Sequence, residues 1–554
     1  MSSPLLAVDN LHLAFGQKEV VKGLSFSIER GARVGMVGES GSGKSLTALS
    51  MIGLLPQGAR VSRGTITWVD EPEEKRFLQE QDSDTWQGIR GRKIGMIFQE
   101  PMSSLNPVQK CGTQIREAIR LHHNCSSREA EDRTLHWMER AGLTDLRRIY
   151  RSYPHQLSGG QKQRVMIALA LCGDPSLLIA DEPTTALDLR IQQQILQLLL
   201  ELSSSLQVSL LFISHDLAVV QQVAEHVVVM EKGKKVEEGS TTELFTSPQT
   251  AYTKGLLACR PPLQHRLHRL PTIEQIRHDG AVRTILAHPK QPTADTTPLL
   301  EGRNLSVHFA SGRGVFRAKT TVKAVDQVDL QLFTGETLGL VGESGSGKTT
   351  LGRCLIGLQE PTAGERFFRG RPLTRQWLRQ PTHRRALQII FQDPFSALNP
   401  RLTVGAAIME PLRWQKNLSE TGRVDRAVTL LEQVGLSAEH LHRYPRAFSG
   451  GQRQRICIAR ALATEPDILV CDESVSALDV SVQAQVLNLL KDLQEKYQLT
   501  YLFISHDLGV IRFMCDRVLV MKDGKLVEKG PAEAIFSDPK AEYTRQLLAA
   551  VPNP

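Results

Sequence analysis

The chain has 554 residues, of which 41% are hydrophobic and 23% are charged, a composition typical of globular proteins. The net charge of +8 is modest for this length and is compatible with an anionic partner or with an ordinary solvated surface. No apolar run approaches the roughly 18–20 residues that span a bilayer, the N-terminus lacks the layout of a secretory signal, and eight dispersed cysteines predict reduced thiols. We therefore expect a cytoplasmic chain of several domains, without disulfides or a zinc framework.

Apolar strands and amphipathic helices alternate along the first half of the chain. We predict strands at residues 5–8, 11–15, 21–28, 33–37, 64–69, 94–98, 177–180 and 208–213. We predict helices from residue 46, at 114–120, at 128–141 and at 191–202. This alternation is typical of an α/β fold with a largely parallel sheet.

The motif G-x-x-x-x-G-K-[ST] occurs at residues 38–45 and 342–349, each time between an apolar strand and a predicted helix. Its glycines allow backbone N–H groups to face phosphate oxygens, and the start of the helix adds partial positive charge. The lysine can reach the β- and γ-phosphates, and the last hydroxyl can hold Mg²⁺. We therefore predict two ATP-type sites that use Gly38, Ser40, Gly41, Gly43, Lys44 and Ser45, and Gly342, Ser344, Gly345, Gly347, Lys348 and Thr349.

The two glycine-rich loops, known as P-loops, belong to a sequence unit that occurs twice in the chain. The spacing between equivalent residues is 304 at the P-loop lysines, 293 at Gln99 and Gln392, and 291 from there on. Length variation is thus confined to one segment of each unit. Prolines and few apolar runs mark residues 259–297 as a linker. We predict one domain at residues 1–258 and a second at 298–554.

Two acidic residues end a buried strand in each unit: Asp181 and Glu182, then Asp472 and Glu473. Beside a P-loop, the aspartate is placed to hold Mg²⁺. The glutamate can act as general base on the attacking water. A histidine follows each candidate base after 33 residues, and we predict that His215 and His506 contact the γ-phosphate.

A Ser-Gly-Gly-Gln motif begins a further helix in each unit and supplies a second anion-binding helix start. Its residues are Ser158, Gly160 and Gln161 in the first unit and Ser449, Gly451 and Gln452 in the second. One domain does not need two such sites for one nucleotide. The second site makes sense if it meets the nucleotide bound by the other domain.

The order of these motifs resembles the ATP-binding domains of ABC transporters, twice over nearly the whole chain. The resemblance implies tandem P-loop domains, each with a mainly parallel sheet, an antiparallel β subdomain and a helical subdomain. It also implies that the domains close head to tail around two nucleotides. One site would join Lys44, Ser45, Gln99, Asp181, Glu182 and His215 to Ser449, Gly451 and Gln452; the other would join Lys348, Thr349, Gln392, Asp472, Glu473 and His506 to Ser158, Gly160 and Gln161.

Further roles follow from the same resemblance. Phe15 is placed to stack on adenine, with Phe309 or Phe316 as its counterpart, and Asp188 and Asp479 would bridge the domains. Mg²⁺ would be held by Ser45, Gln99 and Asp181, and by Thr349, Gln392 and Asp472. Both units retain a glutamate base and a complete Ser-Gly-Gly-Gln motif, which is the signature of the family, so we expect ATP hydrolysis at both sites.

Four segments resemble the oligopeptide, dipeptide and nickel importer group. Two begin at Gln99 and Gln392, called the Q-loop glutamines, and cover 99–107 and 392–400, and the other two close the units at 251–257 and 542–548. This implies a peripheral subunit at the cytoplasmic face of the cell membrane, with two permease subunits and an extracytoplasmic solute-binding protein as partners and no nucleic acid. Peptide, glutathione and nickel remain open as cargo. The alternatives are a soluble tandem ATPase that acts on ribosomes or DNA, which the Pro-broken linker does not fit, and a metabolic kinase, which leaves the signatures unexplained.

Overall fold

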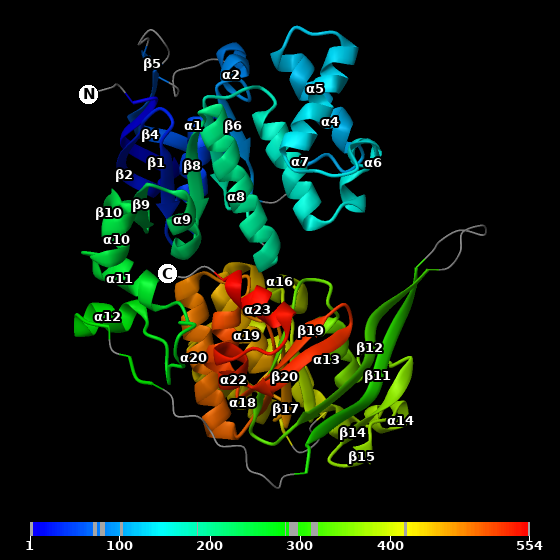
Figure 1. Ribbon diagram of the computed structural model, residues 1–554. Coiled ribbons are helices and arrows are strands. Elements are labelled where there is room, and N and C mark those ends of the chain that lie inside the picture. The colour runs from blue at the N-terminus through cyan, green and yellow to red at the C-terminus, as the bar shows by residue number, and fades with distance from the viewer. Residues whose placement is uncertain are drawn as a thin grey trace. The chain divides into compact units, whose positions relative to one another are not determined.

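The computed structural model describes residues 4–69, 75–77, 83–99, 104–185, 187–282, 284–286, 297–311, 320–414 and 418–551 (Figure 1). These residues form two compact units. Among the described residues, the first contains the chain up to Leu257 together with Ile273–Ala281, and the second contains Ala258–Thr272 together with Val282–Val551. The segment that follows the first nucleotide-binding half therefore packs with the second.

The first unit contains two sheets among its described residues. An antiparallel sheet has the strand order β2-β1-β4-β5, and a second sheet has the order β10-β9-β3-β8-β7-β6, in which only β10 runs antiparallel to its neighbour. The strands are β1 (Leu6–Phe15), β2 (Lys18–Ile28), β3 (Arg33–Val37), β4 (Ala59–Val69), β5 (Lys75–Phe77), β6 (Ile94–Ile97), β7 (Leu177–Asp181), β8 (Ser209–Ser214), β9 (His226–Glu231) and β10 (Lys234–Ser240). This arrangement confirms the predicted α/β fold with a largely parallel sheet.

The strands predicted at 5–8 and 11–15 are one continuous strand, β1. Asn10 adopts a left-handed φ of 45°, and the pairing of β1 with β2 shifts register between Val8 and Leu11. A bulge of this kind breaks the alternation of apolar residues without ending the strand. The sequence pattern therefore shows a gap where the backbone has none.

The helices of the first unit cover the parallel sheet and form a separate helical group. They are α1 (Lys44–Met51), α2 (Ser83–Ile89), α4 (Cys111–His122), α5 (Ser127–Arg140), α6 (Leu146–Arg151), α7 (Gly159–Leu171), α8 (Leu189–Leu206), α9 (Leu217–Val223), α10 (Thr241–Thr246), α11 (Ala251–Ala258) and α12 (Ile273–Asp279), with a 3₁₀ turn at Pro154–Gln156. Figure 1 shows α4, α5 and α6 gathered beside α7, away from the strands. This group is the helical subdomain that the sequence predicts.

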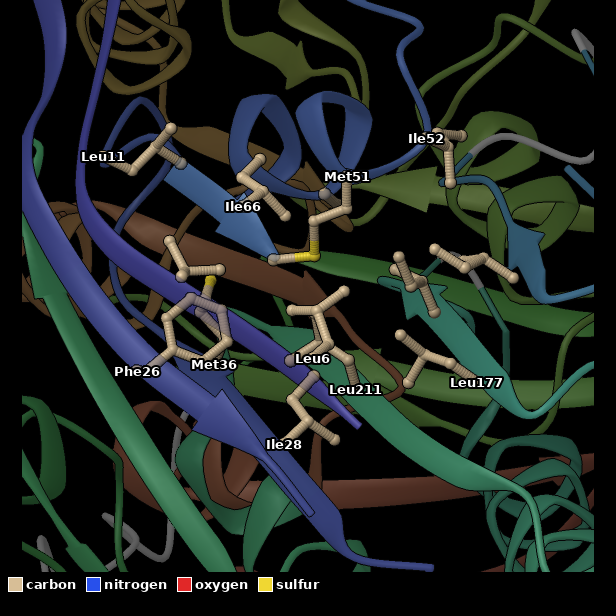
Figure 2. Close-up of a cluster of buried hydrophobic side chains, with 14 of the residues drawn as sticks. Leu6, Leu11, Phe26, Ile28, Met36, Met51, Ile52, Ile66, Leu177 and Leu211 are labelled. Carbon is tan, nitrogen blue, oxygen red and sulfur yellow. The ribbon is translucent and has the colours of Figure 1, made fainter. Parts of the chain in front are cut away.

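The core of the first unit lies between its two sheets and α1. Figure 2 shows Leu6 and Phe26 of the antiparallel sheet facing Met36 and Leu211 of the parallel sheet, with Met51 of α1 above them. These side chains are at most 6% exposed. Since burial of one large apolar side chain stabilises the fold by about 1.5–3 kcal/mol, this cluster fixes the position of α1 and the loop before it.

The second unit repeats this architecture. Its sheets have the orders β12-β11-β14-β15 and β16-β17-β18-β13-β19-β20 among the described residues, and only β20 runs antiparallel in the second sheet. The strands are β11 (Leu300–Ser311), β12 (Thr320–Leu332), β13 (Thr337–Val341), β14 (Ala363–Phe368), β15 (Arg371–Pro372), β16 (Leu387–Ile390), β17 (Ile468–Asp472), β18 (Thr500–Ile504), β19 (Arg517–Lys522) and β20 (Lys525–Pro531).

Helices occupy matching places in the second unit. They are α13 (Lys348–Leu355), α14 (Arg375–Leu378), α15 (Pro381–Arg384), α16 (Pro394–Ala397), α17 (Val404–Met409), α18 (Glu420–Gln433), α19 (Gly450–Leu462), α20 (Val480–Tyr497), α21 (Leu508–Met514), α22 (Ala532–Ser537) and α23 (Glu542–Ala549), with 3₁₀ turns at Pro411–Trp414, Ala438–His442 and Pro445–Ala447. Here α17, α18 and α19 pack together as the helical subdomain. Within the described part of the chain, no helix has the length and apolar character needed to cross a membrane.

Candidate active sites

Each P-loop joins the central strand of a parallel sheet to the first helix. In the first unit, β3 ends at Val37 and α1 begins at Lys44, and Gly43 between them has a φ of 99°. A Cβ atom at Gly38 would lie 2.1 Å from the carbonyl oxygen of Met230, so only glycine fits there. At Gly41, where φ is 80°, a Cβ atom would meet no other atom within 4 Å and would border open space. The loop is therefore tight at its base and open at its tip, as a phosphate cradle requires.

The P-loop lysines are buried in the centre of their own loops. The Nζ of Lys44 donates to the carbonyl oxygens of Gly38 at 2.7 Å and Glu39 at 2.9 Å. In the second unit, Lys348 makes the same bonds to Gly342 and Glu343, both at 2.8 Å. Loop carbonyls thus hold each ammonium group at the place where a phosphate would meet it. The other predicted phosphate-binding residues lie on these same loops and helix starts: Ser40, Ser45, Ser344, Gly345, Gly347 and Thr349.

A buried aspartate accepts a hydrogen bond from the hydroxyl at the start of each P-loop helix. The Oγ of Ser45 lies 3.1 Å from the Oδ1 of Asp181, and the Oγ1 of Thr349 lies 2.8 Å from the Oδ1 of Asp472. Burial raises the pKa of Asp181 to about 6, although the bond from Ser45 opposes that shift. Burial likewise raises the pKa of Asp472. Hydroxyl and carboxylate oxygens are ligands that Mg²⁺ prefers, so this pair fits the cation.

The next residue, Glu182, is held by three side chains. Its carboxylate accepts from Gln99 Nε2 at 3.0 Å and from Thr185 Oγ1 at 3.0 Å, and it lies 3.2 Å from His215 Nδ1. Burial alone would raise the pKa of Glu182, but the bonds from His215 and Thr185 and the charges of His215 and Lys44 outweigh it and bring that pKa to about 2. The carboxylate is therefore ionised and fixed in orientation, while a general base with a pKa nearer the operating pH would accept a proton more readily.

Both candidate bases have an unusual backbone conformation. The φ angle is 47° at Glu182 and also 47° at Glu473, in the left-handed region that residues with a side chain rarely adopt. Such strain, of order 1–3 kcal/mol, is concentrated at functional sites, where the surrounding structure enforces it. The identical angle occurs in both units at the residue directly after the strand-ending aspartate.

The second unit reproduces this cluster with one difference. Gln392 Nε2 donates to Glu473 at 2.7 Å, and His506 Nδ1 lies 3.5 Å from the same carboxylate. Burial would lower the pKa of His506, but the bond and charge of Glu473 outweigh it and raise that pKa. Ser476, which replaces Thr185, donates to the backbone oxygen of Glu473 and not to its carboxylate. The second base therefore lacks one donor that the first base has.

The Ser-Gly-Gly-Gln residues form the N-terminal caps of α7 and α19. The Oγ of Ser158 accepts from the N–H of Gln161 at 3.3 Å, and the Oε1 of Gln161 accepts from the N–H of Ser158 at 3.2 Å. Ser449 and Gln452 form the same capping box. A Cβ atom at Gly160 would lie 2.7 Å from Ile191, and one at Gly451 would lie 2.2 Å from Val482. These hydrogen bonds stay within the helix start, and the role of both signatures toward a nucleotide stays a prediction.

Two aspartates and two aromatic residues complete the predicted set. Asp188 caps α8 by accepting from the N–H of Ile191 at 3.0 Å, and Asp479 immediately precedes α20. Phe15 ends β1 with 40% of its surface exposed, and Phe309 lies in β11 with 43% exposed. The other candidate for adenine stacking, Phe316, lies outside the described residues, as do residues 100–103 of the first Q-loop segment. Domain bridging and adenine stacking therefore stay predictions.

A tyrosine contacts each P-loop, and sequence reasoning did not assign it to the site. The hydroxyl of Tyr252 on α11 accepts from the backbone N–H of Glu39 at 3.1 Å. The hydroxyl of Tyr543 on α23 accepts from Glu343 N–H, also at 3.1 Å. Both tyrosines belong to the closing segments that resemble the peptide importer group. The repetition of this segment in both units could have indicated a role for the tyrosine. Its contact with the P-loop could not be predicted, because the two residues lie about 200 positions apart and no local sequence pattern links them.

Two protein-family models match this chain, and both cover residues of the sites described above. The family model for the ABC transporter matches residues 21–185 and 325–476. The chain belongs to the ABC transporter family. The model for the oligopeptide/dipeptide transporter C-terminal region matches residues 236–283 and 527–554, which include both tyrosines. The family is one of ATPases, and neither match favours the alternative that acts on ribosomes or DNA.

Relatives within the family are similar over nearly the full chain. The glutathione import ATP-binding protein GsiA of Escherichia coli O6:H1 is 46% identical over 99% of this chain and 89% of its own length. GsiA of Escherichia coli K12 is also 46% identical, over 99% of this chain and 89% of its own. Among solved structures, the dimeric ATP-binding cassette MJ0796 bound to ADP and Pi covers 42% of this chain and 98% of its own, with 29% identity and a TM-score of 0.38.

Proposed function

We propose that this chain is the ATP-hydrolysing subunit of an importer for glutathione or a related small peptide. The observation that carries the proposal is the cluster of Glu182, Gln99 and His215 beside a P-loop, repeated in the second unit, in a chain that is 46% identical to GsiA. The peptide-transporter family match to the closing segments of both units supports the cargo class.

Each residue has a defined task in ATP hydrolysis under this proposal. Lys44 and the loop N–H groups bind the β- and γ-phosphates, Glu182 takes a proton from the attacking water, and Gln99 and His215 orient Glu182. Mg²⁺ would be held by Ser45, Gln99 and Asp181, and by Thr349, Gln392 and Asp472, whose donor atoms fit it. When bound, this cation would neutralise charge on the phosphates.

The proposal includes partners that supply the path across the membrane. We propose that two permease subunits and an extracytoplasmic solute-binding protein work with this chain, which would sit at the cytoplasmic face of the cell membrane. Each nucleotide would lie between the P-loop of one unit and the signature of the other. The helix starts at Ser158 and Ser449 are of the kind that binds anions and lie far in sequence from the P-loops, which supports this pairing.

The test is Glu182→Gln combined with Glu473→Gln in the full-length chain. We expect ATP turnover to fall by more than about 100-fold, because each amide lacks the basicity of the carboxylate, while ATP binding persists. Uptake of labelled glutathione by cells that carry the transporter should fall in parallel. Glu201→Gln, an exposed change on α8, is the matched control. Uptake that continues with the double variant, or recovery of the active chain from cells with ribosomes or DNA and without any permease, would refute the proposal.

A further inference from the structure

Residues 258–272, here called the strap, are bound along α20 of the second unit (Figure 1). Lys491 on α20 donates to the carbonyl oxygens of Leu267 at 3.1 Å and His268 at 3.3 Å. Asn488, one turn earlier, both accepts from the N–H of Leu270 at 2.9 Å and donates to its carbonyl oxygen at 2.8 Å. Leu267 and Leu270 are at most 2% exposed. The strap is therefore held on α20 by hydrogen bonds to its backbone and by buried apolar side chains.

The strap also contacts α21. The guanidinium of Arg266 donates to the carbonyl oxygen of Phe513 at 3.2 Å and to the carboxylate of Asp516 at 3.1 Å. It thus caps the C-terminal end of α21, where a cation is favoured by the helix dipole. From the opposite direction, Arg512 of α21 donates to the carbonyl oxygen of Leu263. Arg266 of the strap and Arg512 of α21 therefore both bind across this contact.

A glycine of α21, Gly509, lies against the backbone of the strap. A Cβ atom at Gly509 would lie 2.7 Å from the carbonyl oxygen of Pro261. Gly509 is in the first turn of α21, and glycine forms helices less readily than alanine does. Since Gly509 does not have a left-handed φ, close approach of the strap accounts for it and conformation does not. The position 291 residues earlier, in the first unit, is Ala218.

The other docking positions are also specific to the second unit. The first-unit positions that correspond to Lys491 and Asn488 are Leu200 and Gln197. Neither a leucine nor a glutamine supplies the ammonium group or the short amide that bind the strap carbonyls. A general packing requirement of the fold would place similar residues in both units. This face of the second unit is therefore adapted to the strap.

The two helices that hold the strap begin at the second nucleotide site. α20 begins directly after Asp479, and α21 begins two residues after His506. The carboxylate of Asp507 accepts from the N–H of Gly509 at 2.8 Å, so the turn that touches Pro261 is the turn that follows His506. Movement of the strap would be passed to that histidine through a single helical turn.

We propose that the strap is a positioning element of the second nucleotide site, which holds α21 so that His506 faces Glu473. The role of His506 in this statement rests on the proposed function. Because the first unit carries Ala218 at the contact point, the dependence is confined to one site. The two sites therefore differ in what sets their rate, although their catalytic residues match.

The test uses Gly509→Ala in the full-length chain, placed in two backgrounds. With Glu182→Gln, only the second site turns over, and we expect kcat to fall at least about fivefold while KM for ATP changes less than twofold. With Glu473→Gln, only the first site turns over, and kcat should not change. Amide exchange in Leu508–Met514 should become faster in both backgrounds. Gly88→Ala on α2, where a Cβ meets no atom within 4 Å, is the control and should change nothing.

A second variant, Arg266→Gln, loosens the strap without adding an atom beside α21 and should give the same pattern. Equal loss of kcat in both backgrounds would overturn the proposal, because it would indicate a general defect. Faster exchange in α21 with unchanged turnover at the second site would also overturn it, as would unchanged exchange in both variants. If the unmodified chain hydrolyses no ATP, the proposed function fails, and the docking of the strap is then decided by amide exchange alone.

Discussion

At the scale of single residues, neighbouring groups set the pKa values of the carboxyl groups in each site and satisfy the backbone of its P-loop. Burial raises the pKa of Asp181, while the donors around Glu182 keep its pKa at about 2, so two adjacent carboxyl groups have opposite tendencies. Glu182, which directly follows Asp181, has a left-handed φ. In the P-loop, the hydroxyl of Tyr252 accepts a hydrogen bond from the N–H of Glu39, which follows the end of β3.

This tyrosine contact gives a prediction for nucleotide binding. In Tyr252→Phe, the N–H of Glu39 loses its acceptor, and the loss of one hydrogen bond costs about 1 kcal/mol. We expect Kd for ATP at the first site to rise by about three- to tenfold, with kcat nearly unchanged. Titration of ATP into the variant measures this, and Tyr543→Phe should act equally on the second site. A Tyr497→Phe control, on an exposed ring, should have no effect; an unchanged Kd in Tyr252→Phe would contradict the role.

At the scale of elements, α20 carries a buried lysine whose charge has a measurable consequence. Burial, with the nearby Arg266 and Arg269, lowers the pKa of Lys491 to about 7 against the pull of Asp516 and Glu495. In the unfolded chain the pKa returns to about 10.4. Between these two values the unfolded state binds more protons, so the contribution of Lys491 to stability increases as pH rises. Below pH 7 the full cost of the buried charge is present.

We therefore predict a pH-dependent difference between the unmodified chain and Lys491→Met. The free energy of unfolding of the second unit, relative to the variant, should increase with pH above about 7 by up to about 1.4 kcal/mol per pH unit. Thermal unfolding from about pH 6 to about pH 9 measures the trend, whatever the constant effect of the lost bonds to the strap. Lys496→Met, at an exposed position on the same helix, should give a flat difference. A flat difference in Lys491→Met would show that the lysine stays charged.

Elements with a local pattern were predictable from the sequence, and contacts between distant segments were not. The P-loops, the strands before them and the Asp-Glu strand ends follow from short motifs and apolar runs, and β3 has the predicted bounds. The strap has prolines and few apolar residues, which are equally typical of a free linker, and its partners lie more than 200 residues away. The hydrogen bond from Glu39 to Tyr252 was beyond prediction for the same reason.

At the scale of the whole molecule, two units with separate cores share one chain. The buried cluster around Leu6 and Met36 contains residues of the first unit only, and the cluster around Leu300 and Leu340 contains residues of the second only. Independent cores of this size usually unfold as separate cooperative transitions. Each core also supports one P-loop helix, so nucleotide binding stabilises the core beneath it.

We predict two calorimetric transitions, each raised by a non-hydrolysable ATP analogue. At about 100 times Kd, binding adds about 2.7 kcal/mol to the stability of the unit that binds. Lys44→Ala should remove the shift from one transition and Lys348→Ala from the other, because each lysine lies in the P-loop of a different unit. Lys234→Ala, at an exposed position on β10, would serve as the control. One transition that both lysine variants affect equally would contradict the assignment of separate units.

The assignment of Ala258–Thr272 to one unit and Ile273–Ala281 to the other has a consequence for the gene. A single break in the coding sequence cannot yield two polypeptides that each hold one complete unit. A break at residue 258 would leave α12 on the second product, and a break near residue 290 would leave the strap on the first. In a two-gene version of this sequence, one product would thus carry a segment that belongs to the unit of the other.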